Sequence, residues 1–211
     1  WGFDENSIYL SPAPLYHSAP AGFCTAVQAL GGTVVMMPRF DAEQALESIE
    51  RFEVTHSQWV PTMFSRLLKL PEEARSRYDL SSLKVAIHAA APCPRPVKQQ
   101  MLDWWGDVIY EYYAGTELNG FTHVTPQVWR ERPGTVGQPI LGTIHICDDD
   151  GNELPVGEVG TVYFGNGNEF AYHNDPEKTA STRHAKGWTT LGDMDRVDQE
   201  GYLYLTDRKS F

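Results

Sequence analysis

Four side chains on three segments of the chain have the chemistry that a nucleotide requires. Thr116 and Glu117 follow an aromatic-rich stretch at residues 110–113, and Asp193 and Arg208 stand on later segments. A hydroxyl can donate to phosphate, and a carboxylate suits magnesium, which prefers oxygen ligands. A second carboxylate forms strong hydrogen bonds with ribose hydroxyls. The pattern indicates one phosphate contact, one metal contact and two ribose contacts.

Each of these segments also has an ordinary structural interpretation. Thr116 and Glu117 could begin a helix, where a hydroxyl and an acidic side chain are both favourable. Gly192-Asp193 is a common turn pair, and Arg208 could belong to a solvated charge cluster. The segments taken singly therefore leave the functional and the structural interpretation open.

Taken together, three ordered motifs resemble those of the adenylate-forming enzymes, the acyl-CoA synthetases in particular. That family typically shows Y-G-x-T-E, then W-x-x-T-G-D, then Y-x-x-x-D-R-K. The corresponding segments here are Tyr113-Ala-Gly-Thr-Glu117, Trp188-Thr-Thr-Leu-Gly-Asp193 and Tyr204-Leu-Thr-Asp-Arg-Lys209. Three independent matches in the right order are improbable by chance, which favours the joint interpretation. Ala114 departs from the family glycine and adds a methyl group where the acyl chain often passes.

The resemblance implies a role for each matching residue. Thr116 would hold phosphate and Glu117 would bind magnesium, and these two form the expected catalytic set with His17. Asp193 and Arg208 would hold ribose. The residues expected to bind the nucleotide are Ala89, Ala90, Ala91, Pro92, Tyr112, Tyr113, Asp193, Tyr204 and Arg208.

Two further segments resemble the same family less specifically. His88-Ala-Ala-Ala-Pro92 stands where the family shows Gly-Gly-Ala-Pro or Gly-Ala-Ala-Pro, and small residues there let the backbone approach adenine. Pro14-Leu-Tyr-His17 resembles a Pro-Leu-x-His segment that borders the acyl carboxylate. The alternatives are a plain strand-to-helix turn for the first segment and a structural histidine for the second.

The elements that position these residues follow from hydrophobic periodicity. Short apolar runs typical of strands buried on both faces stand at residues 8–10, 33–37, 54–60, 84–87 and 108–110. Asp41 begins a capping pattern before an apolar stripe of helical spacing. Pro94 and Pro96 introduce a later helix. Strands alternating with helices predict an α/β fold, with a mostly parallel sheet and helical crossovers.

The character of the sequence changes after about residue 133, where glycines punctuate short strands. Residues 143–147 and 159–164 predict one hairpin, and residues 196–198 and 202–205 predict another. We therefore expect an α/β subdomain at 1–133 and a small antiparallel, β-barrel-like subdomain at 134–211.

This layout resembles the latter half of the family's large domain, up to its hinge. The family's phosphate loop and its small C-terminal domain with a catalytic lysine have no match in the chain. We therefore expect a central fragment that folds and is inactive alone.

Composition narrows the function further. The chain has 211 residues, 41% of them hydrophobic, and a formal net charge of -11, which does not favour nucleic-acid binding. Three scattered cysteines suit a reducing, cytoplasmic location, with peripheral membrane association left open. No apolar run approaches the roughly 20 residues that span a bilayer. The sequence contains no G-x-S-x-G and no G-x-G-x-x-G motif, which argues against a hydrolase and a dehydrogenase.

The implied reaction is ATP-dependent activation of a fatty or aromatic acid to acyl-AMP and then to a coenzyme A thioester. The cofactors and partners would be ATP, Mg²⁺, coenzyme A and the acid. One alternative is an amino-acid-activating adenylation domain, although the pocket segments show no clear acidic residue for a substrate amine. The other is a non-catalytic nucleotide-binding module, against which the retained Thr116, Glu117, Asp193 and Arg208 argue. The sequence predicts no oligomeric state.

Overall fold

The computed structural model describes residues 1–205 and 207–208, with side chains described up to residue 205. The chain divides into two compact units, Trp1–Tyr110 (unit 1) and Glu111–Phe211 (unit 2). The sequence-based division between residues 133 and 134 differs from this one and stays a prediction.

Unit 1 contains a parallel sheet with the strand order β2-β1-β3-β4. All residues of β3 and β4 are buried, as expected for strands covered on both faces. The strands are β1 (Ile8–Ser11), β2 (Thr33–Met36), β3 (His56–Trp59) and β4 (Val85–His88). The next strand, β5 (Ile109–Tyr113), begins in unit 1 and continues into unit 2. Each strand predicted in this part of the sequence is present. The predicted burial on both faces is wrong for β2, which lies at the edge of the sheet and has no buried residue.

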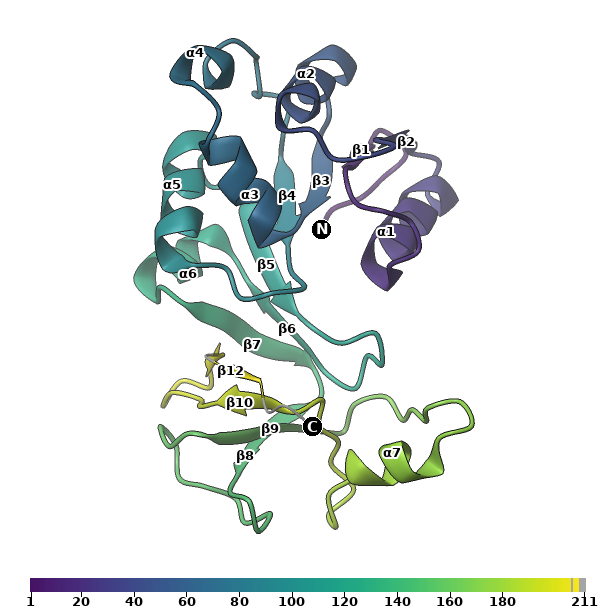
Figure 1. The fold of residues 1–211 in the computed structure, drawn as a ribbon, viewed down its shortest axis with the longest axis vertical. Coiled ribbons are helices and arrows are strands. Elements are labelled where there is room, and N and C mark those ends of the chain that lie inside the picture. Colours follow the sequence, from purple (N-terminus) through teal and green to yellow (C-terminus); the bar gives the residue numbers. More distant parts are fainter. Residues whose placement is uncertain (206, 209–211) are drawn as a thin grey trace. The chain divides into compact units, whose positions relative to one another are not determined.

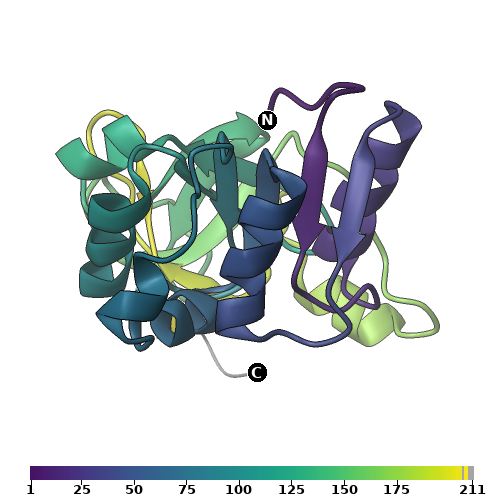
Figure 2. The same cartoon turned by 90° about the horizontal axis from the view of Figure 1, so that it is seen from above.

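Helices connect the strands of unit 1. They are α1 (Ser18–Ala29), α2 (Ala42–Phe52), α3 (Pro61–Leu68), α4 (Glu72–Arg75) and α5 (Arg95–Trp105). Figure 2 shows α1 and α2 on opposite sides of β1 and β2. The chain moves from β1 outward to β2 and then back to β3, and right-handed crossovers in opposite directions place their helices on opposite faces.

The predicted cap of α2 is present. The Asp41 side chain accepts hydrogen bonds from the backbone N–H groups of Glu43 at 3.1 Å and Gln44 at 3.0 Å. These bonds satisfy donors that have no partner inside the helix. The predicted apolar stripe faces the core at Ala42, Ala45, Leu46 and Ile49, which are buried, whereas Phe52 at its end is exposed.

Unit 2 is built from antiparallel strand pairs (Figure 1). One group has the order β5-β6-β7-β11 and the other the order β12-β10-β9-β8. The first comprises β6 (Phe121–Val124), β7 (Thr135–Leu141) and β11 (Leu203–Tyr204) beside β5. The second comprises β8 (Thr143–Cys147), β9 (Gly160–Gly165), β10 (Asp193–Asp195) and β12 (Asp207–Arg208). The helices are α6 (Pro126–Glu131) and α7 (Pro176–Ser181).

Both predicted hairpins are present in unit 2. β8 pairs with β9, and Val197 forms a bridge with Leu203 across the turn at residues 199–201. The core between the strands contains Val136, Ile146, Val162, Phe164 and Leu203. Within the described residues the strand pairings do not close into a barrel, so the barrel-like form is not confirmed.

No helix in the described part of the chain is both long enough and apolar enough to span a bilayer.

Candidate functional site

The first two motifs of the sequence meet inside unit 2. Tyr113 ends β5 and Asp193 begins β10, and the Tyr113 hydroxyl donates to Asp193 Oδ2 at 2.5 Å. Both residues are half-buried. A bond of this kind to a carboxylate is short and strong, because the acceptor is ionised. It places an aspartate and an aromatic ring side by side, from segments separated by 80 residues.

The segment after β5 turns back on itself. The backbone N–H of Leu118 donates to the carbonyl of Gly115 at 3.1 Å, and Leu118 has a positive φ of 50°. A Cβ at position 115 would lie 2.2 Å from Leu191 Cδ1 and 2.7 Å from Glu117 Oε2. A larger residue at position 115 would therefore require the Leu191 and Glu117 side chains to move. The turn presents Thr116 as an exposed side chain and Glu117 as a half-buried one.

The Glu117 carboxylate has a partner that the sequence did not indicate. The Tyr172 hydroxyl donates to Glu117 Oε1 at 2.8 Å. Tyr172 lies between β9 and α7, and is half-buried. The expected metal ligand is therefore oriented by a hydroxyl donor.

A further set of contacts holds the segment that leads into Asp193. Asn119 Nδ2 donates to Thr189 Oγ1 at 3.1 Å and to the Thr189 carbonyl at 3.3 Å. The backbone N–H of Gly192 donates to Thr190 Oγ1 at 3.0 Å. Asn119, Thr189 and Thr190 are all buried. The Thr116–Glu117 turn and the Asp193 segment are therefore joined by buried hydrogen bonds.

Trp188, the first residue of the second motif, stacks on two imidazole rings. Its ring is stacked on His145 with centroids 3.7 Å apart and on His184 with centroids 4.8 Å apart. His145 Nδ1 is 2.6 Å from Glu153 Oε1, and His184 Nε2 is 2.8 Å from the Gly151 carbonyl oxygen. The motif tryptophan thus anchors its segment to the β8–β9 hairpin.

The third motif is described only in part. Arg208 is the Cα partner of Asp193 in the β10–β12 pair, so the two predicted ribose contacts stand opposite each other on neighbouring strands. The side chain of Arg208 and the whole of Lys209 lie outside the described part. Tyr204 belongs to β11 in the other group of strands, and its hydroxyl donates to Asp198 Oδ2 at 3.4 Å.

Tyr112 is largely enclosed within unit 2. It is 8% exposed and its ring stacks on Phe121, with centroids 4.8 Å apart. Burial raises the pKa of Tyr112 to about 12. Its hydroxyl therefore stays protonated at neutral pH and can serve only as a neutral group.

Unit 1 carries the remaining predicted residues. Ala89 is 4% exposed, whereas Ala90, Ala91 and Pro92 are exposed directly after β4. Ala90 has a φ of 76°, in the left-handed region that favours glycine. Ala90 therefore adopts a backbone conformation that glycine would adopt more easily.

His17 stands at the start of α1 on an exposed turn. Its backbone N–H donates to the Pro14 carbonyl at 3.2 Å, and its ring lies 4.4 Å from that of Tyr16. His88, at the end of β4, is instead fully buried. Burial, and then the positive charge of Lys98, hold the pKa of His88 well below its usual range.

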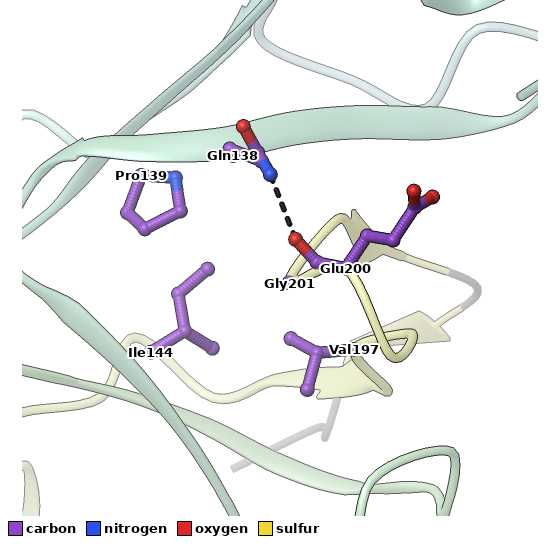
Figure 3. Close-up of a pocket in the computed structure, with 6 residues that line it drawn as sticks. All are labelled: Gln138, Pro139, Ile144, Val197, Glu200 and Gly201. Atoms are coloured by element: carbon purple, nitrogen blue, oxygen red, sulfur yellow. Dashed lines mark hydrogen bonds between the residues drawn. The ribbon is translucent and has the colours of Figure 1, made fainter.

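A hollow of about 390 Å³ lies elsewhere in unit 2 (Figure 3). Its lining includes none of the residues that the sequence predicted for the site. Gln138 crosses one side of it and donates through Nε2 to the Glu200 carbonyl at 2.7 Å. The lining residues are Gln138, Pro139, Ile144, Val197, Glu200 and Gly201.

The donor set in unit 2 fits magnesium brought by a nucleotide. Among the described residues, no three or more His, Cys, Asp or Glu side chains are grouped to hold a metal ion. Magnesium in nucleotide sites is commonly held by one or two carboxylates together with substrate phosphates and water. The half-buried carboxylate of Glu117, beside the exposed hydroxyl of Thr116, matches that arrangement.

Sequence reasoning missed Tyr172, Asn119 and the two histidines around Trp188. No local pattern connects residue 172 with residue 117, because the contact depends on tertiary folding. Asn119 could have been noticed because it stands two residues after Glu117. The hydrogen bonds between Asn119 and Thr189 could not have been predicted from the sequence.

The family model described as "AMP-binding enzyme" matches residues 1–170. The rice (Oryza sativa subsp. japonica) 4-coumarate–CoA ligase-like 6 is 34% identical over 208 residues, covering 96% of this chain and 34% of that protein. The solved amide bond synthetase McbA from Marinactinospora thermotolerans matches with a TM-score of 0.85 and 32% identity, over 99% of this chain and 43% of that one. ATP-bound MatB from Rhodopseudomonas palustris matches with a TM-score of 0.84 and 27% identity, over 99% and 41%.

The chain belongs to the AMP-binding enzyme family. Its fold is similar to those of McbA and MatB. It spans well under half of the length of the relatives and structures that it matches.

Proposed function

We propose that this chain forms part of an enzyme that activates a carboxylic acid with ATP and transfers the acyl group to coenzyme A. The observation that carries the proposal is the joining of two motif segments in unit 2, through the Tyr113–Asp193 hydrogen bond and the Asn119–Thr189 contacts. Membership of the AMP-binding enzyme family and similarity to a CoA ligase-like protein support it.

In this proposal each residue acts on a different part of the nucleotide. Asp193 accepts from the ribose hydroxyls while Tyr113 holds its Oδ2 oxygen in place. Thr116 donates its hydroxyl to phosphate. Arg208, opposite Asp193 in the strand pair, gives a second ribose contact. The Tyr113 ring borders adenine, as do residues 89–92, with Tyr112 and Tyr204 supporting the nucleotide-binding segments.

The proposed first step joins the acid to AMP. A carboxylate oxygen of the acid attacks the α-phosphorus of ATP, the bond to the bridging oxygen breaks, and pyrophosphate leaves. Catalysis of such a step rests on positioning and charge stabilisation. Glu117 would hold Mg²⁺, which neutralises phosphate charge when bound. A thiolate then displaces AMP from the acyl carbon, which forms the thioester.

We propose a fatty or aromatic acid as the substrate. The support is the apolar and aromatic character of the Tyr16–His17 turn, where Tyr16 is 83% exposed, and of Phe23 on α1. His17 borders the carboxylate in this proposal. Ala114 narrows the acyl path by one methyl group, so Ala114→Gly is expected to improve use of bulkier acids.

A second candidate shares the first step and differs in the acceptor. Similarity to the amide bond synthetase McbA, which is 32% identical, favours an amine in place of the coenzyme A thiol. Incubating the enzyme with acid and ATP, and then with coenzyme A or a panel of amines, separates the two by product mass.

The decisive experiment is ATP–pyrophosphate exchange with the natural gene product across a panel of fatty, aromatic and amino acids. The proposal predicts exchange with fatty or aromatic acids and loss of exchange in Glu117→Gln. Faster exchange with amino acids would replace the proposed substrate class, and absence of exchange with every acid would overturn the proposed function.

We also propose that the 211-residue chain alone binds nucleotide weakly and does not turn over. In the proposal the relatives' remaining sequence supplies groups for the β- and γ-phosphates and for closure over the site, and loss of one such donor costs about 10²–10³ in rate. Pyrophosphate release by the chain, compared with that by the natural gene product, tests this.

A further inference from the structure

Tyr172 contacts Glu117 from a part of the chain that the proposed chemistry does not use. The two residues are 55 positions apart, and their side chains meet through the hydroxyl-to-Oε1 bond of 2.8 Å. We propose that Tyr172 is a positioning residue that orients Glu117 for the metal-bound nucleotide. This inference rests on the proposed function.

Tyr172 is itself held by its own segment. Its backbone N–H donates to Thr179 Oγ1 at 2.9 Å, and its carbonyl accepts from the N–H of Asp175 at 3.3 Å. Its ring packs edge-on against Phe170, with centroids 5.5 Å apart. The Tyr172 hydroxyl therefore reaches Glu117 from a segment that is held by local hydrogen bonds. A partner fixed in this way orients a carboxylate at a small entropic cost.

Helix α7 braces that segment. Asp175 caps the helix by accepting from the Lys178 N–H at 2.9 Å, and Thr179 Oγ1 also donates to the Asp175 carbonyl at 2.8 Å. Arg183 donates to the Phe170 carbonyl and stacks over the Phe170 ring. The loop before the helix and the turn after it are thus tied together around Tyr172.

Lys178 adds a charge to the same arrangement. Its ammonium nitrogen lies 4.3 Å from the centroid of the Tyr172 ring. A cation over the ring face is attracted to the ring electrons and draws density away from the phenol oxygen. The hydroxyl becomes a better donor toward Glu117. Lys178 is exposed, so this contribution is small compared with the hydroxyl itself.

The opposite side of the Glu117 carboxylate is also confined. A Cβ atom at position 115 would lie 2.7 Å from Glu117 Oε2. The absence of a side chain at Gly115 therefore leaves space for this oxygen. One oxygen is bound by a phenol and the other rests over a glycine. Carboxylate oxygens are the ligands that a hard cation prefers. Partners of this kind orient metal ligands and change metal affinity when they are removed.

The test is Tyr172→Phe in the natural gene product, which removes the hydroxyl and keeps the ring against Phe170 and Lys178. Binding of Mn²⁺ in the presence of ATP, without any acid, is measured by electron paramagnetic resonance of the free ion. We expect affinity to fall about 10-fold, within the range seen when outer partners of metal ligands are lost. The half-saturating Mg²⁺ concentration for ATP–pyrophosphate exchange should rise in parallel, and excess Mg²⁺ should restore the rate.

Tyr202→Phe is the matched control. It removes another tyrosine hydroxyl of unit 2, one whose ring contacts Arg132, with the guanidinium carbon 4.5 Å from the ring centroid. It should leave Mn²⁺ affinity and Mg²⁺ dependence at the wild-type values. A melting temperature is recorded for each variant, so that loss of folding is separated from loss of metal affinity.

A double-mutant cycle with Glu117→Gln tests whether Tyr172 acts through Glu117. If it does, adding Tyr172→Phe to Glu117→Gln changes Mn²⁺ affinity little beyond the single variant, because coupled residues are not additive. Additive losses would overturn the inference. So would a Tyr172→Phe variant with unchanged or tighter Mn²⁺ binding, or one whose lost rate Mg²⁺ does not restore.

The proposed function fails separately. Wild-type protein that shows no exchange with any acid removes that function, and the inference that depends on it. Wild-type exchange with an unaltered Tyr172→Phe variant removes only the inference.

Discussion

Unit 2 holds its candidate residues by side-chain hydrogen bonds between distant segments, whereas unit 1 presents its candidates at the ends of a strand and a helix. In unit 2 Tyr113 bonds to Asp193 and Tyr172 bonds to Glu117. In unit 1 the segment after β4 forms a turn through its backbone conformation, in which Ala90 has a φ of 76°.

The two arrangements should respond differently to mutation. A site built from paired side chains loses its geometry when one partner is removed, because the other loses the hydrogen bond that orients it. A site built from backbone responds mainly to changes in conformational freedom or in the size of a side chain. Expected effects are therefore largest where unit 2 depends on pairs and smallest where unit 1 depends on small residues.

The largest effect is expected at Asp193. Asp193→Ala removes the proposed ribose contact and the acceptor of the Tyr113 hydroxyl, so ATP use should weaken by about 1–3 kcal/mol. The apparent KM for ATP in pyrophosphate exchange measures this. The exposed Asp150→Ala is the control, and an unchanged KM in Asp193→Ala would contradict the assignment.

Gly115→Ala tests the close approach beside Glu117. The new methyl group would lie 2.2 Å from Leu191 Cδ1, the end of a flexible side chain, so Leu191 must move and the free energy of unfolding should fall by about 1 kcal/mol, the low end of the cost of overpacking. Urea denaturation measures it. Gly22→Ala in α1 is the opposite case, because nothing lies within 4 Å of the added carbon, and it should stabilise by about 0.5–1 kcal/mol.

Unit 1 should show a pH dependence centred on His88. Its pKa is lower in the folded than in the unfolded chain, because burial and the Lys98 charge disfavour the protonated form. Stability is therefore fully present above the unfolded pKa of about 6.5, and falls by up to about 1.4 kcal/mol per pH unit below it. Urea unfolding across this range should show the slope, and His88→Gln should reduce it, with the remainder arising from His56, whose pKa is also lowered by burial. An equal slope in the variant would count against His88 as the cause.

The smallest effect is expected at Ala90. Ala90→Gly relieves a left-handed conformation that costs an alanine about 1–2 kcal/mol, and loses about 0.5–1 kcal/mol of chain entropy. Net stabilisation should be about 0.5 kcal/mol by urea denaturation. Ala91→Gly, outside the left-handed region, should instead destabilise by a similar amount. If both variants destabilise, strain at Ala90 is not significant.

Local patterns predicted much of unit 1 because they depend on neighbouring residues. The strands near residues 8, 33, 56 and 85 are confirmed, as is the Asp41 cap of α2. Helix α1 was not predicted. Its first residues include Pro20 and Gly22, and no side chain caps it, so it depends on packing against β1 and β2.

The sequence by itself determined the fold class, the two hairpins of unit 2 and the motifs that carry Thr116, Glu117 and Asp193. Periodicity, turn residues and motif order are properties of the sequence itself, so they can be recognised before the fold is known. Only the tertiary structure decided that Tyr113 bonds to Asp193 and Tyr172 to Glu117. Those pairs join residues 80 and 55 positions apart, and such contacts form only when packing brings distant segments together.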